Sequence, residues 1–193
     1  MSCEISPNPY RDLSPDNIRL LRLLPSENKN APIECELFNY SLEHSDERTH
    51  PYEALSYVWG HSYKHRSISI GKYYLPVTDN LHDALSRLRY RSFGRIIWVD
   101  AICINQENII EKQQQIQLMA KIYGVASRVV VWLGAAEADS DLAIKEIRAA
   151  GGNKLKNFSN NEAIRQAVLA LLQRPWFSRI WVWRYILDIH GYY

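Results

Sequence analysis

Residues 96–133 constrain the fold more strongly than any other part of the chain. They hold two short runs of consecutive apolar residues, 96–99 and 129–133, without the polar alternation of a strand that has one face in solvent. Between these runs, apolar residues recur at helical spacing. A strand, a helix and a second strand in this order favour a parallel sheet with a right-handed crossover. The sequence therefore predicts an α/β fold in which helices flank a parallel sheet.

The segment between the two runs has the pattern of a long helix. Asn108 and Glu111 have the spacing of a capping box at its start, although Asn stands where Ser or Thr is usual. Gly124 suits the position just after the last helical turn. One face of the predicted helix carries the apolar residues Ile109, Ile116, Met119, Ala120 and Tyr123.

The preceding part of the chain is predicted to be rich in strands. Residues 1–17 are polar with several prolines, and we interpret them as a loose N-terminal arm. From Asp79, the expected N-cap of the first helix, helical spacing takes over. We therefore divide the rest into a β-rich part, residues 18–78, and an α/β part, residues 79–182. Strands are expected at 18–24, 33–37 and 54–59, a hairpin turn at 71–72, and further helices at 141–150 and 162–172.

Composition limits the class of protein to which the chain can belong. The 193 residues carry a formal net charge of +2, which gives no strong attraction to nucleic acid or to a membrane surface. The sequence has no signal-peptide pattern and no run near the ~20 apolar residues that cross a bilayer. Cys3, Cys35 and Cys103 lie far apart, so neither a disulfide framework nor a zinc site is expected. These features predict an intracellular protein of the reducing cytoplasm without a membrane partner.

Polar and aromatic residues follow two of the predicted strands at their carboxyl ends. In an open α/β sheet, ligands bind at this edge. The expected ligand pocket is formed by Ser56, Tyr57, Trp59 and Gly60 at the carboxyl end of one strand and by Asp100, Asn105 and Gln106 after the other. The same residue types also cap strand ends by satisfying loop N–H groups, and this alternative stays open.

Two other groups of residues resemble binding sites without having the full pattern of one. His61 and His65 are four residues apart, but they fall in a predicted loop without a third ligand, so no metal site is expected. Four arginines between residues 87 and 95 resemble a basic patch, which the attraction of cations to a helix C-terminus explains. We therefore expect no nucleic-acid partner.

Five motifs follow one another along the chain: YEALSYVWG, LPVTDNLHDALSRLR, IIWVDAICINQEN, QIQLMAKIYGVASRVVVWLG and RPWFSRIWV. In order and spacing they resemble the fungal heterokaryon incompatibility (HET) domain over residues 18–182. The resemblance implies a role in self/non-self recognition that ends in programmed cell death, a form of fungal innate immunity. The partners that it implies are other HET-domain or incompatibility proteins, with self-association. It leaves residues 183–193 as a divergent C-terminal tail.

The HET domain is distantly similar to TIR domains, whose fold is a flavodoxin-like parallel sheet. This likeness implies a TIR/flavodoxin-like sheet preceded by an N-terminal β-rich extension. Many TIR domains cleave NAD⁺ at the nicotinamide bond with a glutamate four residues after a tryptophan. Counted from Trp181, the glutamate position is Tyr185 and the glutamine before it is Arg184. A phenol with a pKa near ~10 cannot supply a negative charge at neutral pH.

The resemblance therefore predicts no catalytic residue and no cofactor in this copy, which would act through protein association. Asp188 lies about one helical turn further on and is not expected to replace the missing acid. An active NAD⁺ glycohydrolase stays open as an alternative, with Asp100, Glu107 or Glu111 as the carboxylate that stabilises the oxocarbenium-like centre. A third alternative is an inert fragment that inhibits full-length relatives. Near the C-terminus, Trp176, Phe177 and Trp181 are interpreted as packing residues.

Overall fold

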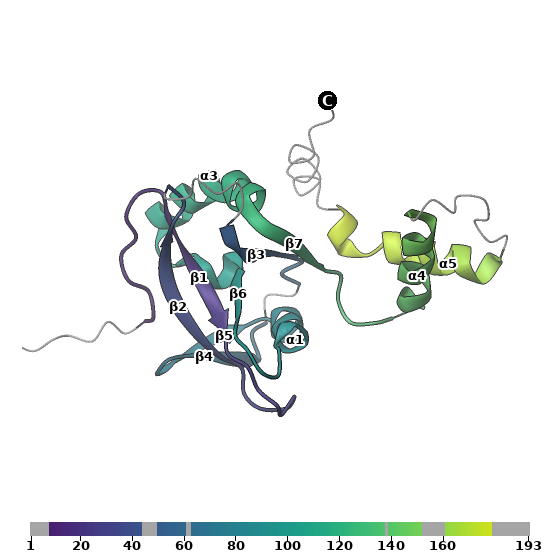
Figure 1. The fold of residues 1–193 in the computed structure, drawn as a ribbon, viewed down its shortest axis with the longest axis horizontal. Coiled ribbons are helices and arrows are strands. Elements are labelled where there is room, and N and C mark those ends of the chain that lie inside the picture. The colour runs from purple at the N-terminus through teal and green to yellow at the C-terminus, as the bar shows by residue number, and fades with distance from the viewer. Residues whose placement is uncertain (1–7, 44–49, 61–62, 138, 152–160, 179–193) are drawn as a thin grey trace, which may run out of the picture.

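The computed structural model describes residues 8–43, 50–60, 63–137, 139–151 and 161–178, so the predicted tail and the first seven residues of the predicted arm lie outside it. Within the described residues, seven strands form one sheet in the order β5-β4-β2-β1-β6-β3-β7 (Figure 1). The strands are β1 (Asn17–Leu23), β2 (Glu34–Ser41), β3 (His50–Tyr57), β4 (Arg66–Ile70), β5 (Tyr73–Val77), β6 (Arg95–Trp98) and β7 (Ala126–Trp132). Helices flank this sheet, so the predicted α/β class is confirmed.

The sheet is mixed, and only part of it is the predicted parallel sheet. β3 pairs in parallel with β6 on one side and with β7 on the other. β1 runs antiparallel to β6 and β2, and β2 continues through parallel β4 to antiparallel β5. The connection from β1 to β2 is shorter than the dozen or so residues that a parallel crossover needs, which explains why these two strands are antiparallel. β3, from the part predicted to be an extension, lies between two strands of the α/β part.

The four long helices begin and end close to the predicted positions, whereas the short helices at 100–103 and 175–178 were not predicted. They are α1 (Asp79–Leu88), α2 (Asp100–Cys103), α3 (Ile109–Val125), α4 (Ser140–Gly151), α5 (Glu162–Leu172) and the 3-10 helix η1 (Pro175–Ser178). Asn108 caps α3 as predicted, because its side chain accepts from the Glu111 N–H at 3.1 Å. The prediction that Asp79 caps α1 is wrong: Thr78 is the N-cap and Asp79 is the first helical residue. Gly124 does not end α3, which continues to Val125. None of the helices in the described ranges combines the length and apolarity needed to cross a bilayer.

α1 and α3 cover opposite faces of the parallel strands (Figure 1). Trp98 of β6, opposite Ala54 of β3, packs edge-on against Tyr123 of α3 with ring centroids 5.5 Å apart. Trp132 of β7 is paired with Tyr57 of β3, which lies three residues after Ala54. Because side chains alternate along a strand, the Trp132 side chain points to the other face of the sheet. There its indole N–H donates to Asn80 of α1 at 2.8 Å.

β1 is buried on both faces and joins the two halves of the sheet. Ile18, Leu20, Leu21 and Leu23 are each at most 1% exposed. Burying a leucine or isoleucine side chain contributes about 1.5–3 kcal/mol, so this strand is a large part of the core. Arg19, in the middle of the strand, is equally buried and needs a compensating partner.

The described part of the predicted loose arm, residues 8–16, contacts this strand. The Arg11 carbonyl oxygen accepts a hydrogen bond from the Arg19 guanidinium. That guanidinium also lies 5.1 Å from the ring centroid of Tyr10. Burial raises the pKa of the Tyr10 phenol to about 12. Tyr10 therefore packs against the sheet, and the exposed Arg11 contacts it through its backbone.

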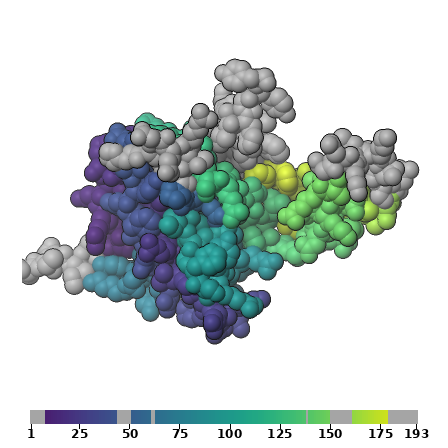
Figure 2. All heavy atoms as spheres, viewed as in Figure 1, coloured from purple at the N-terminus to yellow at the C-terminus, as the bar shows by residue number. Residues whose placement is uncertain are grey.

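α4 and α5 pack on each other and stand out from the body that contains the sheet (Figure 1, Figure 2). Ala143, Ala167 and Leu171 form a small core of their own between these helices. The guanidinium of Arg174, just after α5, donates to three carbonyl oxygens in the loop that follows β7, at residues 133, 135 and 137. Arg174 thus joins the end of the helical pair to the end of the sheet.

Candidate functional site

The carboxyl ends of β3 and β6 form a topological switch point. The connection that leaves β3 contains α1 and returns as β6, whereas the connection that leaves β6 contains α3 and returns as β7. Because α1 and α3 lie on opposite faces, the chain leaves these neighbouring strands in opposite directions. The crevice between two such strand ends is where open α/β sheets bind ligands.

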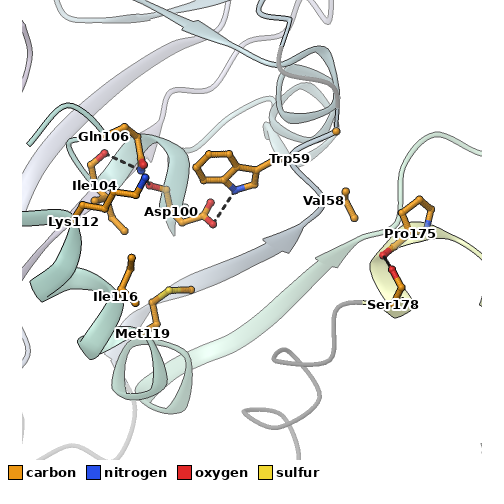
Figure 3. A pocket seen from close by; sticks show the side chains of 11 residues that line it. Val58, Trp59, Asp100, Ile104, Gln106, Lys112, Ile116, Met119, Pro175 and Ser178 are labelled. Atoms are coloured by element: carbon orange, nitrogen blue, oxygen red, sulfur yellow. Dashed lines mark hydrogen bonds between the residues drawn. The ribbon is translucent and has the colours of Figure 1, made fainter. Parts of the chain in front are cut away.

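A cavity of about 530 Å³ lies at this point, a volume within the usual range for a small-molecule site. Its walls come from the residue runs that follow β3 and β6, from α3 and from η1 (Figure 3). The lining residues are Val58, Trp59, Gly60, Asp100, Ile104, Gln106, Lys112, Ile116, Met119, Pro175 and Ser178. The cavity is therefore largely apolar, with one carboxylate and one ammonium group among the described residues that line it.

Four of the seven residues predicted for a ligand pocket line this cavity, namely Trp59, Gly60, Asp100 and Gln106. The structure thus brings together residues that are about forty positions apart in the sequence, because β3 and β6 are neighbours. Whether they bind a ligand stays a prediction.

The other three predicted residues, Ser56, Tyr57 and Asn105, do not line the cavity. Ser56 is buried and accepts a hydrogen bond from the Trp176 indole at 3.0 Å. Tyr57 is buried in the core on the α1 side of the sheet. The Asn105 side chain accepts from the Glu107 N–H at 3.2 Å, which is the loop-capping role given as the alternative. Their own bonds and packing explain why these residues face elsewhere.

Asp100 links the two polar walls of the cavity. Its carboxylate accepts from the Trp59 indole N–H at 3.0 Å (Figure 3). It also accepts from the Ala101 backbone N–H at 2.7 Å. The Gln106 amide donates to the Asp100 carbonyl oxygen at 2.9 Å. These bonds fix the polar edge of the indole, while 42% of the Trp59 side chain stays exposed. The arrangement gives the cavity an aromatic surface in a fixed orientation.

The backbone around Trp59 is also fixed. Gly60 has φ +72°, a left-handed conformation that glycine adopts without strain. The Asn80 amide donates to the Val58 carbonyl oxygen at 2.6 Å and accepts from Trp132. A side chain of α1 therefore ties the ends of β3 and β7 together beside the cavity.

Sequence reasoning missed the α3 and η1 walls. Lys112, Ile116 and Met119 are four and three residues apart, so they lie on one helix face. Their spacing was available in the sequence, but tertiary packing decides that this face meets the strand ends. Pro175 and Ser178 follow α5, and no local sequence signal connects them to β3.

The three carboxylates considered as replacements for a catalytic glutamate lie in different environments. Asp100 lines the cavity, whereas Glu107 is exposed and does not. Glu111 is buried in a bidentate pair with Arg19 of β1, with N···O distances of 2.5 and 3.0 Å. It also accepts from the Asn105 backbone N–H at 2.8 Å. The capping box predicted for α3 is therefore wrong in one of its two hydrogen bonds. The Glu111 carboxylate bonds to Arg19 of β1 and to the loop before α3, and not back to the helix N-cap.

Cys35 and Cys103 are buried free thiols. Burial raises the pKa of each thiol to about 12. Because the thiolate is the nucleophilic form, both side chains are unreactive at neutral pH. They pack as small apolar groups.

Two arginines of the basic patch at residues 87–95 have structural contacts. Arg89 donates to four carbonyl oxygens between residues 28 and 32, and Arg95 pairs with Glu53. Two of the four arginines in the basic patch therefore bond to other residues of the fold. His61 lies outside the described residues, and no His, Cys, Asp and Glu cluster that could hold a metal is found in the part that is described.

The fold and cavity define an α/β domain with a pocket at the switch point of a mixed sheet. The family model "Heterokaryon incompatibility protein (HET)" matches residues 52–184, and the chain belongs to this family. Over 148 residues it is 34% identical to heterokaryon incompatibility protein 6, OR allele, of Neurospora crassa. That match covers 70% of the chain but 21% of the relative. No solved structure matches the chain, and the TIR likeness stays a prediction.

Proposed function

We propose that the chain acts in heterokaryon incompatibility as a protein-association domain. It recognises an incompatibility partner in the cytoplasm and promotes programmed cell death when the two associate, which is self/non-self recognition of the innate-immune kind. Its family membership supports the incompatibility setting, as does the name of the N. crassa relative.

The environment of Asp100 is the observation that favours association over catalysis. A carboxylate that stabilises or attacks a sugar cation must present an oxygen to the ligand. The Asp100 oxygens accept hydrogen bonds from Trp59 and Ala101, which favours a structural role in shaping the cavity. Glu111 is engaged by Arg19, away from the cavity.

We expect the chain to reduce viability when it is expressed in a fungal host, alone or beside a full-length relative, and to do so without the Asp100 charge. Asp100→Asn keeps the size of the side chain and an oxygen that accepts from Trp59, and it loses the acceptor for the Ala101 N–H. This variant should therefore kill as well as the wild type and as well as Asp83→Asn, an exposed control on α1. Viable-cell counts after induction are the measurement. Killing that Asp100→Asn alone abolishes would contradict the proposal, and protection against a full-length relative would support the inhibitor alternative.

NAD⁺ cleavage is the second candidate function, and the position of Asp100 favours it. Asp100 lies in the cavity beside the half-exposed Trp59 ring, and Lys112 lines the same space. An indole face can stack on a nicotinamide, and an ammonium group can pair with a diphosphate. Water would add to the ribose C1′ carbon as the C–N bond to nicotinamide breaks, with release of one proton. The carboxylate would stabilise the positive charge that develops on the ribose.

Nicotinamide release from NAD⁺ by the purified chain separates the two functions. Under the association proposal, we expect a rate equal to the protein-free rate for both the wild type and Asp100→Asn. Under the second candidate, the wild type turns over and Asp100→Asn loses at least ~100-fold in rate. Turnover that Asp100→Asn abolishes but Asp83→Asn retains would overturn the non-catalytic proposal.

A further inference from the structure

The solvent-exposed face of α3 carries no charged residue along its central stripe. Residues at intervals of four, three and four share one face of a helix. One stripe of this kind on α3 consists of Ile109, Gln113, Ile116 and Ala120, which are all exposed. Ile116 also lines the cavity, as does Lys112 one turn before it. Ile110 and Gln117 flank it and are also exposed. We call these six residues the outer face of α3.

This outer face is unusual for a helix surface in contact with water, which normally carries charged side chains. Ile109 and Ile110 are 71% and 70% exposed, and Ile116 is 50% exposed. The face of α3 that packs on the sheet contains Glu111 and Gln115, which bond to Arg19 and to the Asn17 carbonyl oxygen. The aliphatic side chains are thus on the outside because buried polar contacts occupy the inside.

Opposite charges lie at the two ends of the outer face. Glu107 precedes α3 and Lys121 lies near its C-terminal end, and both are exposed. Neither forms an ion pair with another of the described residues. Fourteen residues of helix rise by about 21 Å, so each charge is free to meet a partner at a separate end.

We propose that the outer face of α3 is the surface through which two copies of this chain associate, with the two α3 helices antiparallel about a two-fold axis. The inference rests on the proposed function, since it names the surface that association would use. The axis passes between residues 113 and 116, so that Ile109 of one copy meets Ala120 of the other. Glu107 of each copy then lies beside Lys121 of the second copy, so this ion pair forms twice by symmetry.

Charge complementarity is what selects a second copy as the occupant. A patch that is negative at one end and positive at the other is complementary to itself only when the second helix is reversed. The reversed arrangement also places the two helix dipoles antiparallel, which is favourable. A single helix pair buries less than the ~800 Å² per partner of a standard interface, so we expect a dissociation constant in the micromolar range.

Analytical ultracentrifugation of the purified chain over a concentration series tests the surface. We expect a reversible monomer–dimer equilibrium, and we expect Ile109→Asp to weaken dimerisation by at least ~10-fold because it places a charge at the interface. Asp at the first turn of a helix is favourable, so this variant should fold normally, which circular dichroism checks. Leu169→Asp, an equally radical change at a half-exposed leucine of α5, is the matched control and should dimerise like the wild type.

Charge exchange tests the antiparallel geometry independently. Glu107→Lys and Lys121→Glu should each weaken the dimer several-fold, and the double variant should restore the wild-type constant, because the pairs re-form with reversed sign. A wild type that stays monomeric at its highest soluble concentration, or a dimer indifferent to Ile109→Asp, would overturn the inference. Cell killing by such a protein would leave the proposed function intact. A dimer of the expected kind that does not kill would instead count against the proposed function alone.

Discussion

Replacing Arg19 with Met is expected to lower the free energy of unfolding by about 3–5 kcal/mol, because it leaves the Glu111 carboxylate buried without its charged partner. Arg19 is 1% exposed and spans from β1 to the start of α3. Met retains most of the apolar stem, so the loss reports on the ion pair and its hydrogen bonds. Urea unfolding followed by circular dichroism measures the change.

The same strand offers a matched control. Arg22 of β1 pairs with Glu36 at 2.9 Å, but both side chains are about half exposed. Arg22→Met should therefore cost no more than ~1 kcal/mol. A further variant, Arg19→Met combined with Glu111→Leu, removes both buried charges and should recover much of the lost stability. Equal effects of Arg19→Met and Arg22→Met would show that burial does not govern the contribution of this pair.

Trp176→Ala is the second large effect, with an expected loss of about 3–5 kcal/mol. The Trp176 ring is 5% exposed, packs edge-on against Phe177, and donates to Ser56 at the end of β3. It thereby holds η1, a wall of the cavity, against the sheet. Thermal and urea unfolding give the size of the effect.

Two variants separate packing from hydrogen bonding at this site. Trp176→Phe keeps an aromatic ring but loses the bond to Ser56, so we expect a smaller loss, with about 1 kcal/mol from the hydrogen bond. Tyr74→Ala truncates an aromatic residue of β5 that is 78% exposed, and it should change stability by less than ~0.5 kcal/mol. If Trp176→Ala were as mild as Tyr74→Ala, Trp176 could not be the anchor of η1.

The parallel half of the sheet could be predicted because each of its strands contains a run of apolar residues, although β7, at the edge of the sheet, is only partly buried and not covered on both faces as expected. Runs of consecutive apolar residues identify such strands without any knowledge of their neighbours. The carboxyl-edge rule then selected Trp59, Gly60, Asp100 and Gln106, which line one cavity. Local pattern was sufficient there because a strand end is a local feature.

Long-range partners could not be predicted. Arg19 and Glu111 are 92 positions apart, and nothing in either segment indicates that the other will neutralise it. The apolar face of α3 illustrates the same limit. Ile109 and Ile116 looked like core positions, but the bond from Arg19 to Glu111 turns the opposite side of the helix inward. Periodicity identifies a face, and tertiary contacts decide where that face points.

The place of β1 in the sheet has a consequence for how the protein is made on the ribosome. β1 can pair with β2 as soon as both have emerged, but its other edge waits for β6, since Leu21 pairs with Ile97. At roughly 5–20 residues per second of synthesis, that delay is about 4–15 s. During it the nascent chain presents a deeply apolar, unpaired strand edge, which is a template for aggregation with neighbouring nascent chains. The yield of native protein should therefore depend on how quickly translation passes Trp98.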